Sequence, residues 1–143
     1  MPAGRKNATM FHEMIFPAYK KIAALFGRLA YGCCEPVHSF WEKSLSTLDN
    51  LYRISISPWC DEEFMGERLR GTGITFLRKP PATILGMDTP VLDEEATLNC
   101  FRKTAKAARG CKLEIAQRDV YMVGNSPEKV RRFVELARQG LGE

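Results

Sequence analysis

Strand-like and helix-like segments alternate along this chain, and that alternation restricts its possible folds more than any other feature. β-Branched, aromatic and aliphatic residues concentrate in four segments, 28–34, 51–60, 73–77 and 111–120, a composition typical of buried strands. A helical pattern follows each segment, and a further one precedes the first. Regular alternation specifies parallel strands joined by right-handed crossovers. The chain is therefore predicted to be an α/β protein, either a doubly wound sheet or a (β/α) barrel.

Capping residues mark the expected ends of the helices. Ser, Thr and Asp side chains accept hydrogen bonds from first-turn N–H groups, whereas glycine readily takes the left-handed conformation that ends a helix. The helices are predicted over 9–26, 35–48, 61–70, 93–109 and 126–139, with a proline-rich loop over 78–90. The predicted N-caps are Thr9, Asp61, Asp93 and Ser126, and the glycines predicted to end helices are Gly27, Gly71, Gly110 and Gly140. Pro17 is predicted to start or kink the second half of the first helix.

Size and charge limit the classes of protein to which the chain can belong. With 143 residues, 45% of them hydrophobic, it is long enough for one compact domain. The net charge of +4 comes from basic residues dispersed among acidic ones, which does not favour nucleic-acid binding. No apolar run approaches the roughly 18 residues that a membrane span needs, so no membrane association is expected.

Cysteine usage and the first residues point to a reducing compartment. The chain has five cysteines, an odd number, and its N-terminal residues lack the apolar stretch of a secretory leader. We therefore expect a cytoplasmic protein with reduced thiols.

Four motifs at or near the expected strand ends carry a family resemblance. They are YGCCEPVH (31–38), ISISPWCDEEF (54–64), RKPPA (78–82) and RDVYMVGNSPEKVRRFVELAR (118–138). In this order they resemble the C-terminal half of the uroporphyrinogen decarboxylase-like superfamily, and particularly its corrinoid-associated methyltransferase branch. The resemblance implies that residues 10–143 form half of a TIM (β/α)8 barrel, strands five to eight, and that residues 1–9 are a disordered tail.

Half of such a barrel cannot close by itself. Four parallel strands leave two edges and an inward face without cover, which soluble proteins avoid. We therefore expect the chain to form a homodimer or to pair with a complementary N-terminal half-barrel, unless it is a truncated gene product. The resemblance further implies a corrinoid protein as the partner that donates or accepts a methyl group.

Zinc is the metal that the resemblance implies. In the zinc-dependent methyltransferases of this superfamily, a His-x-Cys after the fifth strand and a Cys after the last strand hold zinc, which activates a substrate thiol. Here Tyr31 replaces that His, Cys33 matches the first Cys, and Arg118 or Asp119 stands in place of the second. Thiolate and imidazole groups are good zinc ligands. The predicted metal ligands are Cys33, Cys34, His38 and Cys60.

A structural interpretation of these thiols stays open, because free cysteine is among the most buried residue types. In an extended strand Cys33 and Cys34 point to opposite faces, so at most one of them is expected to enter the barrel mouth. His38 falls in the first turns of a helix, where packing alone would also explain it. Cys100 and Cys111 lie away from the strand ends and are predicted to be structural.

Further candidates lie at the other strand ends. Glu35, Arg118 and Asp119 are the predicted catalytic residues, although N-terminal capping of a helix would also explain Glu35. Asp119 would supply an oxygen ligand, whereas Arg118 would bind an anion such as a carboxylate. Lys79 and Trp59 are predicted to bind substrate or corrinoid, with a solvated loop and a core position as their alternatives.

Three functions follow from this pattern. The first is corrinoid-dependent methyl transfer with a thiol-based, zinc-assisted site. The second is a non-catalytic half-barrel that binds a ligand or partner, or a fragment that needs an N-terminal half. Decarboxylation of a porphyrinogen is the third, and it is disfavoured because the resemblance places the Arg and Asp residues of that reaction in the N-terminal half.

Overall fold

The computed structural model describes residues 8–32, 34–86 and 91–143, and these residues form a four-stranded sheet. The strands are β1 (Leu29–Tyr31), β2 (Leu51–Ile56), β3 (Thr75–Arg78) and β4 (Lys112–Ile115). Each strand is parallel to its neighbours, in the spatial order β1-β2-β3-β4. The predicted α/β class with parallel strands is confirmed.

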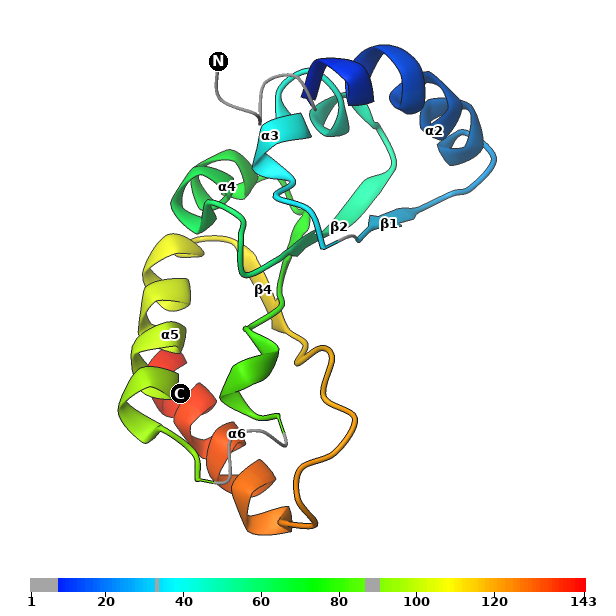
Figure 1. Cartoon of the computed structure of the whole chain (residues 1–143). Helices are drawn as coiled ribbons and strands as arrows, with labels where there is room; N and C mark the ends of the chain where they lie inside the picture. The colour runs from blue at the N-terminus through cyan, green and yellow to red at the C-terminus, as the bar shows by residue number, and fades with distance from the viewer. Residues whose placement is uncertain (1–7, 33, 87–90) are drawn as a thin grey trace.

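The strand order determines where the connecting helices lie. When parallel strands follow one another in sequence order, every right-handed crossover falls on the same side of the sheet. A doubly wound sheet instead reverses direction at a switch point and places helices on both faces. Figure 1 shows α2 beside β1 at one end of the sheet and the packed pair α5 and α6 at the other. The described sheet is therefore singly wound.

The two faces of the sheet differ in composition. Ile54, Phe76 and Leu113 form one row across β2, β3 and β4, and they join the main hydrophobic core with side chains from the helices. Side chains alternate along a strand, so the neighbouring residues point to the opposite face. On that face Arg53 and Glu114 form an ion pair of 2.9 Å, with side chains 33% and 45% exposed. This second face is polar and open to solvent at that pair.

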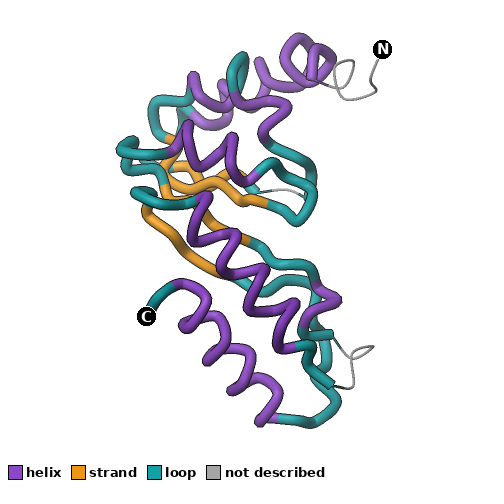
Figure 2. The backbone as a smooth tube through the Cα atoms, turned by 90° about the vertical axis from the view of Figure 1, so that its left-hand side faces the viewer, coloured by secondary structure: helices purple, strands orange, loops and turns teal. Residues whose placement is uncertain are grey.

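The helical segments flank the strands in the predicted alternation. They are η1 (Phe11–Ile15), a π-helix, α2 (Phe16–Ala23), α3 (His38–Trp41), the 3-10 helix η2 (Leu45–Thr47), α4 (Glu62–Leu69), the 3-10 helix η3 (Ala82–Ile84), α5 (Glu94–Ala107) and α6 (Pro127–Leu141). Figure 2 shows α5 and α6 side by side, where the rings of Phe101 and Phe133 meet edge to face at 5.5 Å. Within the described residues, no helix combines the length and apolar character that crossing a bilayer requires.

Most of the predicted helix ends are confirmed. The side chains of Asp61, Asp93 and Ser126 each accept a hydrogen bond from the first turn of α4, α5 and α6. Gly71 and Gly110 have the left-handed φ values of 74° and 80° that follow a helix end.

Four expectations at the helices need correction. Gly27 does not end the first helical segment, because α2 already ends at Ala23 and Gly27 does not have a left-handed φ. Thr9 is not an N-cap, because residues 8–10 are already helical; residues 1–7 of the expected tail lie outside the described residues. Gly140 does not end α6, which continues to Leu141 and is capped by Gly142 with φ 86°. The expected helix over 35–48 divides into α3 and η2, where Thr47 Oγ1 donates to the Ser44 carbonyl oxygen, a side-chain bond that competes with regular helix.

Gly66 is required by the close contact between α4 and α5. A β-carbon at Gly66 would lie 1.9 Å from the carbonyl oxygen of Ala107, whereas at Gly27 it would meet nothing within 4 Å. We predict that Gly66→Ala lowers the free energy of unfolding by about 3 kcal/mol, since overpacking forces backbone shifts. Gly27→Ala should change it by less than ~1 kcal/mol. Urea denaturation of both variants checks this, and equal stabilities would contradict the α4–α5 contact.

Candidate functional site

All four strands end at the same edge of the sheet, and the segments that follow them carry the predicted site residues. Residues 32–37 follow β1, 57–60 follow β2, 79–81 follow β3 and 116–120 follow β4. In parallel α/β sheets, open or closed, ligands bind beyond the carboxyl ends of the strands. We call this region the strand-end edge.

The loops after the first and last strands meet at Cys34 and Arg118. Arg118 Nη2 donates a hydrogen bond to Cys34 Sγ at 2.9 Å, and the same guanidinium forms an ion pair with Asp119. The pKa of Arg118 is raised, first by its hydrogen bond to Asp119 and then by the one to Cys34. Cys34 is exposed, while the Arg118 side chain is only 19% exposed. The geometry therefore places a fixed cation between a carboxylate and an accessible thiol.

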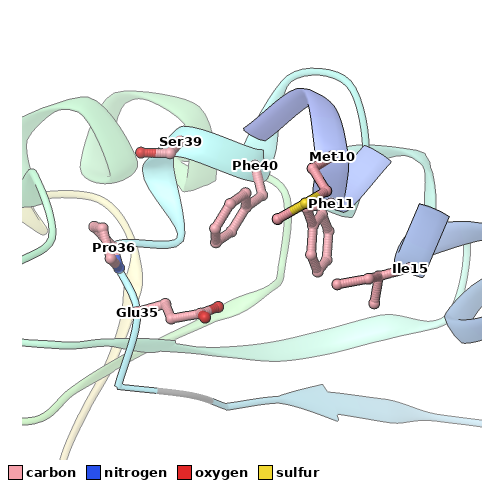
Figure 3. Close-up of a pocket in the computed structure, with 7 residues that line it drawn as sticks. All are labelled: Met10, Phe11, Ile15, Glu35, Pro36, Ser39 and Phe40. Carbon is pink, nitrogen blue, oxygen red and sulfur yellow. The ribbon is translucent and has the colours of Figure 1, made fainter. Parts of the chain in front are cut away.

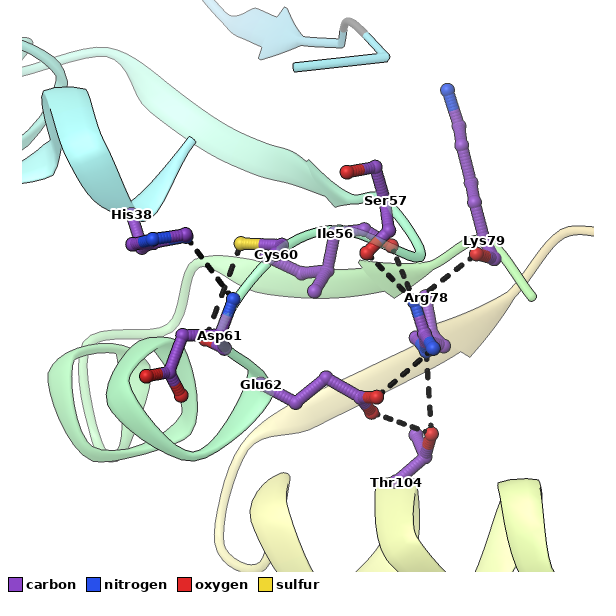
Figure 4. A network of polar contacts seen from close by, with 9 residues as sticks. All are labelled: His38, Ile56, Ser57, Cys60, Asp61, Glu62, Arg78, Lys79 and Thr104. Atoms are coloured by element: carbon purple, nitrogen blue, oxygen red, sulfur yellow. Dashed lines mark hydrogen bonds and ion pairs between the residues drawn. The ribbon is translucent and has the colours of Figure 1, made fainter. Parts of the chain in front are cut away.

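Lys79 brings a second cation to this edge. It follows β3, and Figure 4 shows its side chain extending away from the neighbouring polar network. A β-carbon on Gly32 would lie 3.6 Å from Lys79 Nζ and 2.8 Å from Ser55 Oγ. The ammonium group thus reaches across β2 to the loop after β1, and the missing side chain at Gly32 leaves room for it. Sequence reasoning identified Lys79 but missed Gly32 and Ser55.

Arg78 points to the opposite face and anchors the loops beneath the edge. Its side chain is 4% exposed, as is that of Glu62, with which it forms an ion pair of 2.9 Å. It also donates to the carbonyl oxygens of Ile56 and Ser57 at 3.1 and 2.9 Å, while Thr104 donates to Glu62 at 2.7 Å. This network, drawn in Figure 4, joins the end of β2 to the start of α4 and the last turn of α5. Its role is structural.

His38 and Cys60 belong to a different cluster from Cys34. His38 Nδ1 accepts a hydrogen bond from the backbone N–H of Asp61 at 3.1 Å, and its ring packs edge to face on Phe64. Cys60 is buried, which raises the pKa of its thiol to about 11 despite a backbone hydrogen bond from His38 that lowers it. Both residues therefore serve the junction between β2 and α4.

The described residues do not fit a zinc site by themselves. Among them, no three His, Cys, Asp or Glu side chains gather as metal ligands would. Cys34 contacts a guanidinium, Nδ1 of His38 is occupied by a peptide N–H, and Cys60 is held as a buried neutral thiol. Cys33 lies outside the described residues. We assign no chemical step to a metal.

The remaining candidates occupy separate positions. Glu35 lines a pocket with residues of η1 and α3, and none of the other predicted site residues that the structure describes lines it. Trp59 is 65% exposed in the turn after β2, so the alternative of a core position is wrong. Glu62 was missed as a partner of Arg78, although its place in the first turn of a capped helix beside a strand end was a usable signal.

Comparison with known proteins identifies no relative, since no family model, curated protein or solved structure matches the chain. The functional interpretation accordingly depends on the strand-end geometry and on the sequence motifs.

The buried pair of Arg78 and Glu62 should dominate the stability of this region. We predict that Arg78→Met lowers the free energy of unfolding by about 3–5 kcal/mol, because it leaves the Glu62 carboxylate buried without its counter-ion. Arg68→Met is the matched control: Arg68 pairs with Glu42, but their side chains are 45% and 56% exposed, so its cost should be about 0–1 kcal/mol. Similar losses of unfolding free energy for the two variants, measured by chemical denaturation, would refute a special role for the buried pair.

Cys60 should make stability depend on alkaline pH. Its thiol pKa rises from 9.0 to about 11 on folding, so the folded state holds this proton more tightly than the unfolded state. The resulting stabilisation is complete below pH 9 and is lost as the pH rises through about 11. Between these values the free energy of unfolding should fall more steeply for the unaltered chain than for Cys60→Ala. Parallel slopes in a pH series of urea titrations would show that the thiol is not buried.

Proposed function

We propose that the chain is the C-terminal half of a uroporphyrinogen decarboxylase-like barrel, and that its strand-end edge contributes to a methyl-transfer site. The contact between Arg118 and Cys34 is the observation that carries this proposal. It joins residues 84 positions apart, one from the loop after the first strand and one from the loop after the last. Two of the four motifs that carry the family resemblance, 31–38 and 118–138, therefore meet in space.

The architecture supports the barrel part of the proposal. A (β/α)8 barrel is singly wound, with every helix outside and every strand end at one mouth. The sequential order of β1 to β4 and the helix-covered face of the sheet agree with half of such a barrel. The open face with Arg53 and Glu114 would then become part of the interior.

Closure requires a partner at the free edges of the sheet. The edge at β1 carries an apolar cavity of about 210 Å³, lined by residues that include Tyr19, Ile22, Leu29 and Leu45. Ile22 is 53% exposed. Such a groove fits the apolar side chains of an added strand and helix. We propose a complementary N-terminal half-barrel or a second copy of the chain as that partner, with a corrinoid protein as the methyl carrier.

The edge chemistry suits an anionic substrate. Arg118 and Lys79 supply two cations, and a guanidinium pairs well with a carboxylate or phosphate. In methyl transfer a sulfur lone pair forms the new bond to the methyl carbon, and the electron pair of the broken bond stays with the methyl carrier. The substrate thiol supplies that sulfur and releases its proton to solvent, while Cys34 lies beside Arg118, next to where that thiol would bind. Zinc assistance would require ligands from the complementary half, because the described residues do not complete a set.

A non-catalytic half-barrel is the second candidate. The open polar face and the apolar groove at β1 favour it, because a bound partner would cover both surfaces. Porphyrinogen decarboxylation has weaker support, because its expected acidic and basic groups belong to the absent half.

A methyl-transfer assay distinguishes these candidates. The chain is assayed alone and with a complementary half-barrel, with methylcobalamin as donor and 3-mercaptopropionate as an anionic thiol acceptor, and demethylation is followed by absorbance. We predict that Arg118→Met lowers the rate about tenfold or more, since a charged donor is lost, and that Cys34→Ser also lowers it. The control Arg102→Met removes an exposed cation from α5 and should leave the rate unchanged.

Sedimentation and unfolding curves of the same variants complete the experiment. Turnover that is unaffected by Arg118→Met and Cys34→Ser would contradict a role for the strand-end edge. A chain that pairs with its partner but shows no turnover would favour the non-catalytic half-barrel. A folded, monodisperse monomer that binds no complementary half would contradict the half-barrel itself.

A further inference from the structure

A pocket between the N-terminal helix and the loop after β1 is separate from the contact between Arg118 and Cys34. It has a volume of about 260 Å³, near the lower end of the range for small-molecule sites. It is formed by η1, by the loop after β1 and by α3. The residues that line it are Met10, Phe11, Ile15, Glu35, Pro36, Ser39 and Phe40.

Aromatic side chains form a rigid floor for this pocket. The rings of Phe11 and Phe40 stack at 4.5 Å and are 5% and 7% exposed. Phe16 and Tyr19 pack against Phe11 from other sides, at 6.1 and 6.0 Å between ring centroids. The floor therefore keeps its shape without a ligand, and it offers an apolar surface to the pocket.

One carboxylate gives the pocket its charge. Figure 3 shows the side chain of Glu35 directed from its loop into the space bounded by Phe11, Phe40 and Ile15. Ser57 Oγ donates to the backbone carbonyl oxygen of Glu35 at 3.3 Å, which holds this part of the loop in place. Among the described residues, no cationic side chain forms an ion pair with the Glu35 carboxylate.

These features select a class of ligand. A metal ion would need several oxygen, nitrogen or sulfur ligands, and the pocket offers a single carboxylate. Glu35 is exposed, so water solvates its carboxylate when the pocket is empty. An anion would be repelled by it, and a neutral apolar molecule would gain no charge interaction from it. A short apolar body fits the aromatic floor, and an ammonium group pairs with the carboxylate.

We propose that this pocket binds a small organic ammonium ion with a short apolar body. The ammonium group donates to Glu35, and the apolar body lies on Phe11 and Phe40 between Met10 and Ile15. The net charge of +4 on the chain disfavours indiscriminate binding of cations, so the preference must come from the pocket. The proposal does not depend on methyl transfer.

Isopentylammonium and isopentanol provide a matched pair of probes, because they share one apolar body and differ in the charged group. Their binding to the full chain is measured by NMR titration at neutral pH. We expect isopentylammonium to bind about tenfold more tightly than isopentanol, with the largest shifts at Phe11, Glu35 and Phe40. Glu35→Gln should remove this preference.

Glu67→Gln is the control variant, because it removes the same charge from an exposed position on α4 and should keep the preference. Ile15→Lys is a second test, since it places a cation beside the carboxylate and should weaken isopentylammonium binding. Equal affinity for the two probes would overturn the proposal, as would an ammonium preference that survives Glu35→Gln. The absence of binding at millimolar concentration would also overturn it.

Discussion

The buried ion pair between Arg78 and Glu62 fixes the positions of the strand end and the helices on which the rest of this structure depends. Burying two charges is costly, and the cost is offset only when both groups find further hydrogen bonds. Here they do: Arg78 donates to two carbonyl oxygens at the end of β2, and Thr104 donates to Glu62. The end of β2, the start of α4 and the last turn of α5 are thereby fixed to one another. The positions of the loops at the strand-end edge depend on these contacts.

Two adjacent cationic residues differ in role because their side chains point in opposite directions. Arg78 and Lys79 are neighbours at the end of β3, and alternation along the strand sends one into the helix-covered core and the other to the strand-end edge. The first is a stabilising cation that solvent does not reach. The second reaches the strand-end edge, where Arg118 also lies.

Sequence reasoning recovered the strand–helix alternation because hydrophobic periodicity and capping residues are local signals. Asp61, Asp93 and Ser126 cap their helices as predicted. Gly140 was misassigned for a tertiary reason: a β-carbon there would lie 2.6 Å from Cβ of Phe101, so this glycine permits close packing of α6 on α5. No local pattern distinguishes that requirement from a helix end.

The candidate site was predictable in outline but not in its pairings. Cys34 and Arg118 were both identified because they follow strands, yet their contact depends on how the loops bend. His38 and Cys60 were also chosen because they lie close after strands. In the structure, however, the peptide N–H of Asp61 binds His38 Nδ1, and burial raises the pKa of Cys60 and keeps its thiol protonated. The spacing of residues in the sequence does not show which side chains are already hydrogen-bonded or buried in this way. The pocket at Glu35 likewise requires η1 and α3 to come together across the chain.

The two free edges of the sheet differ in character, and this limits how copies of the chain can associate. The β1 edge is an apolar groove, whereas β4 presents the exposed charges of Lys112 and Glu114. If two copies paired through these edges with their strands parallel and their helices on the same side, β4 of one copy would lie beside β1 of the next. This heterologous contact has a direction. Two such contacts around an axis would close a ring of eight strands, whereas without closure the same contact would propagate as a filament.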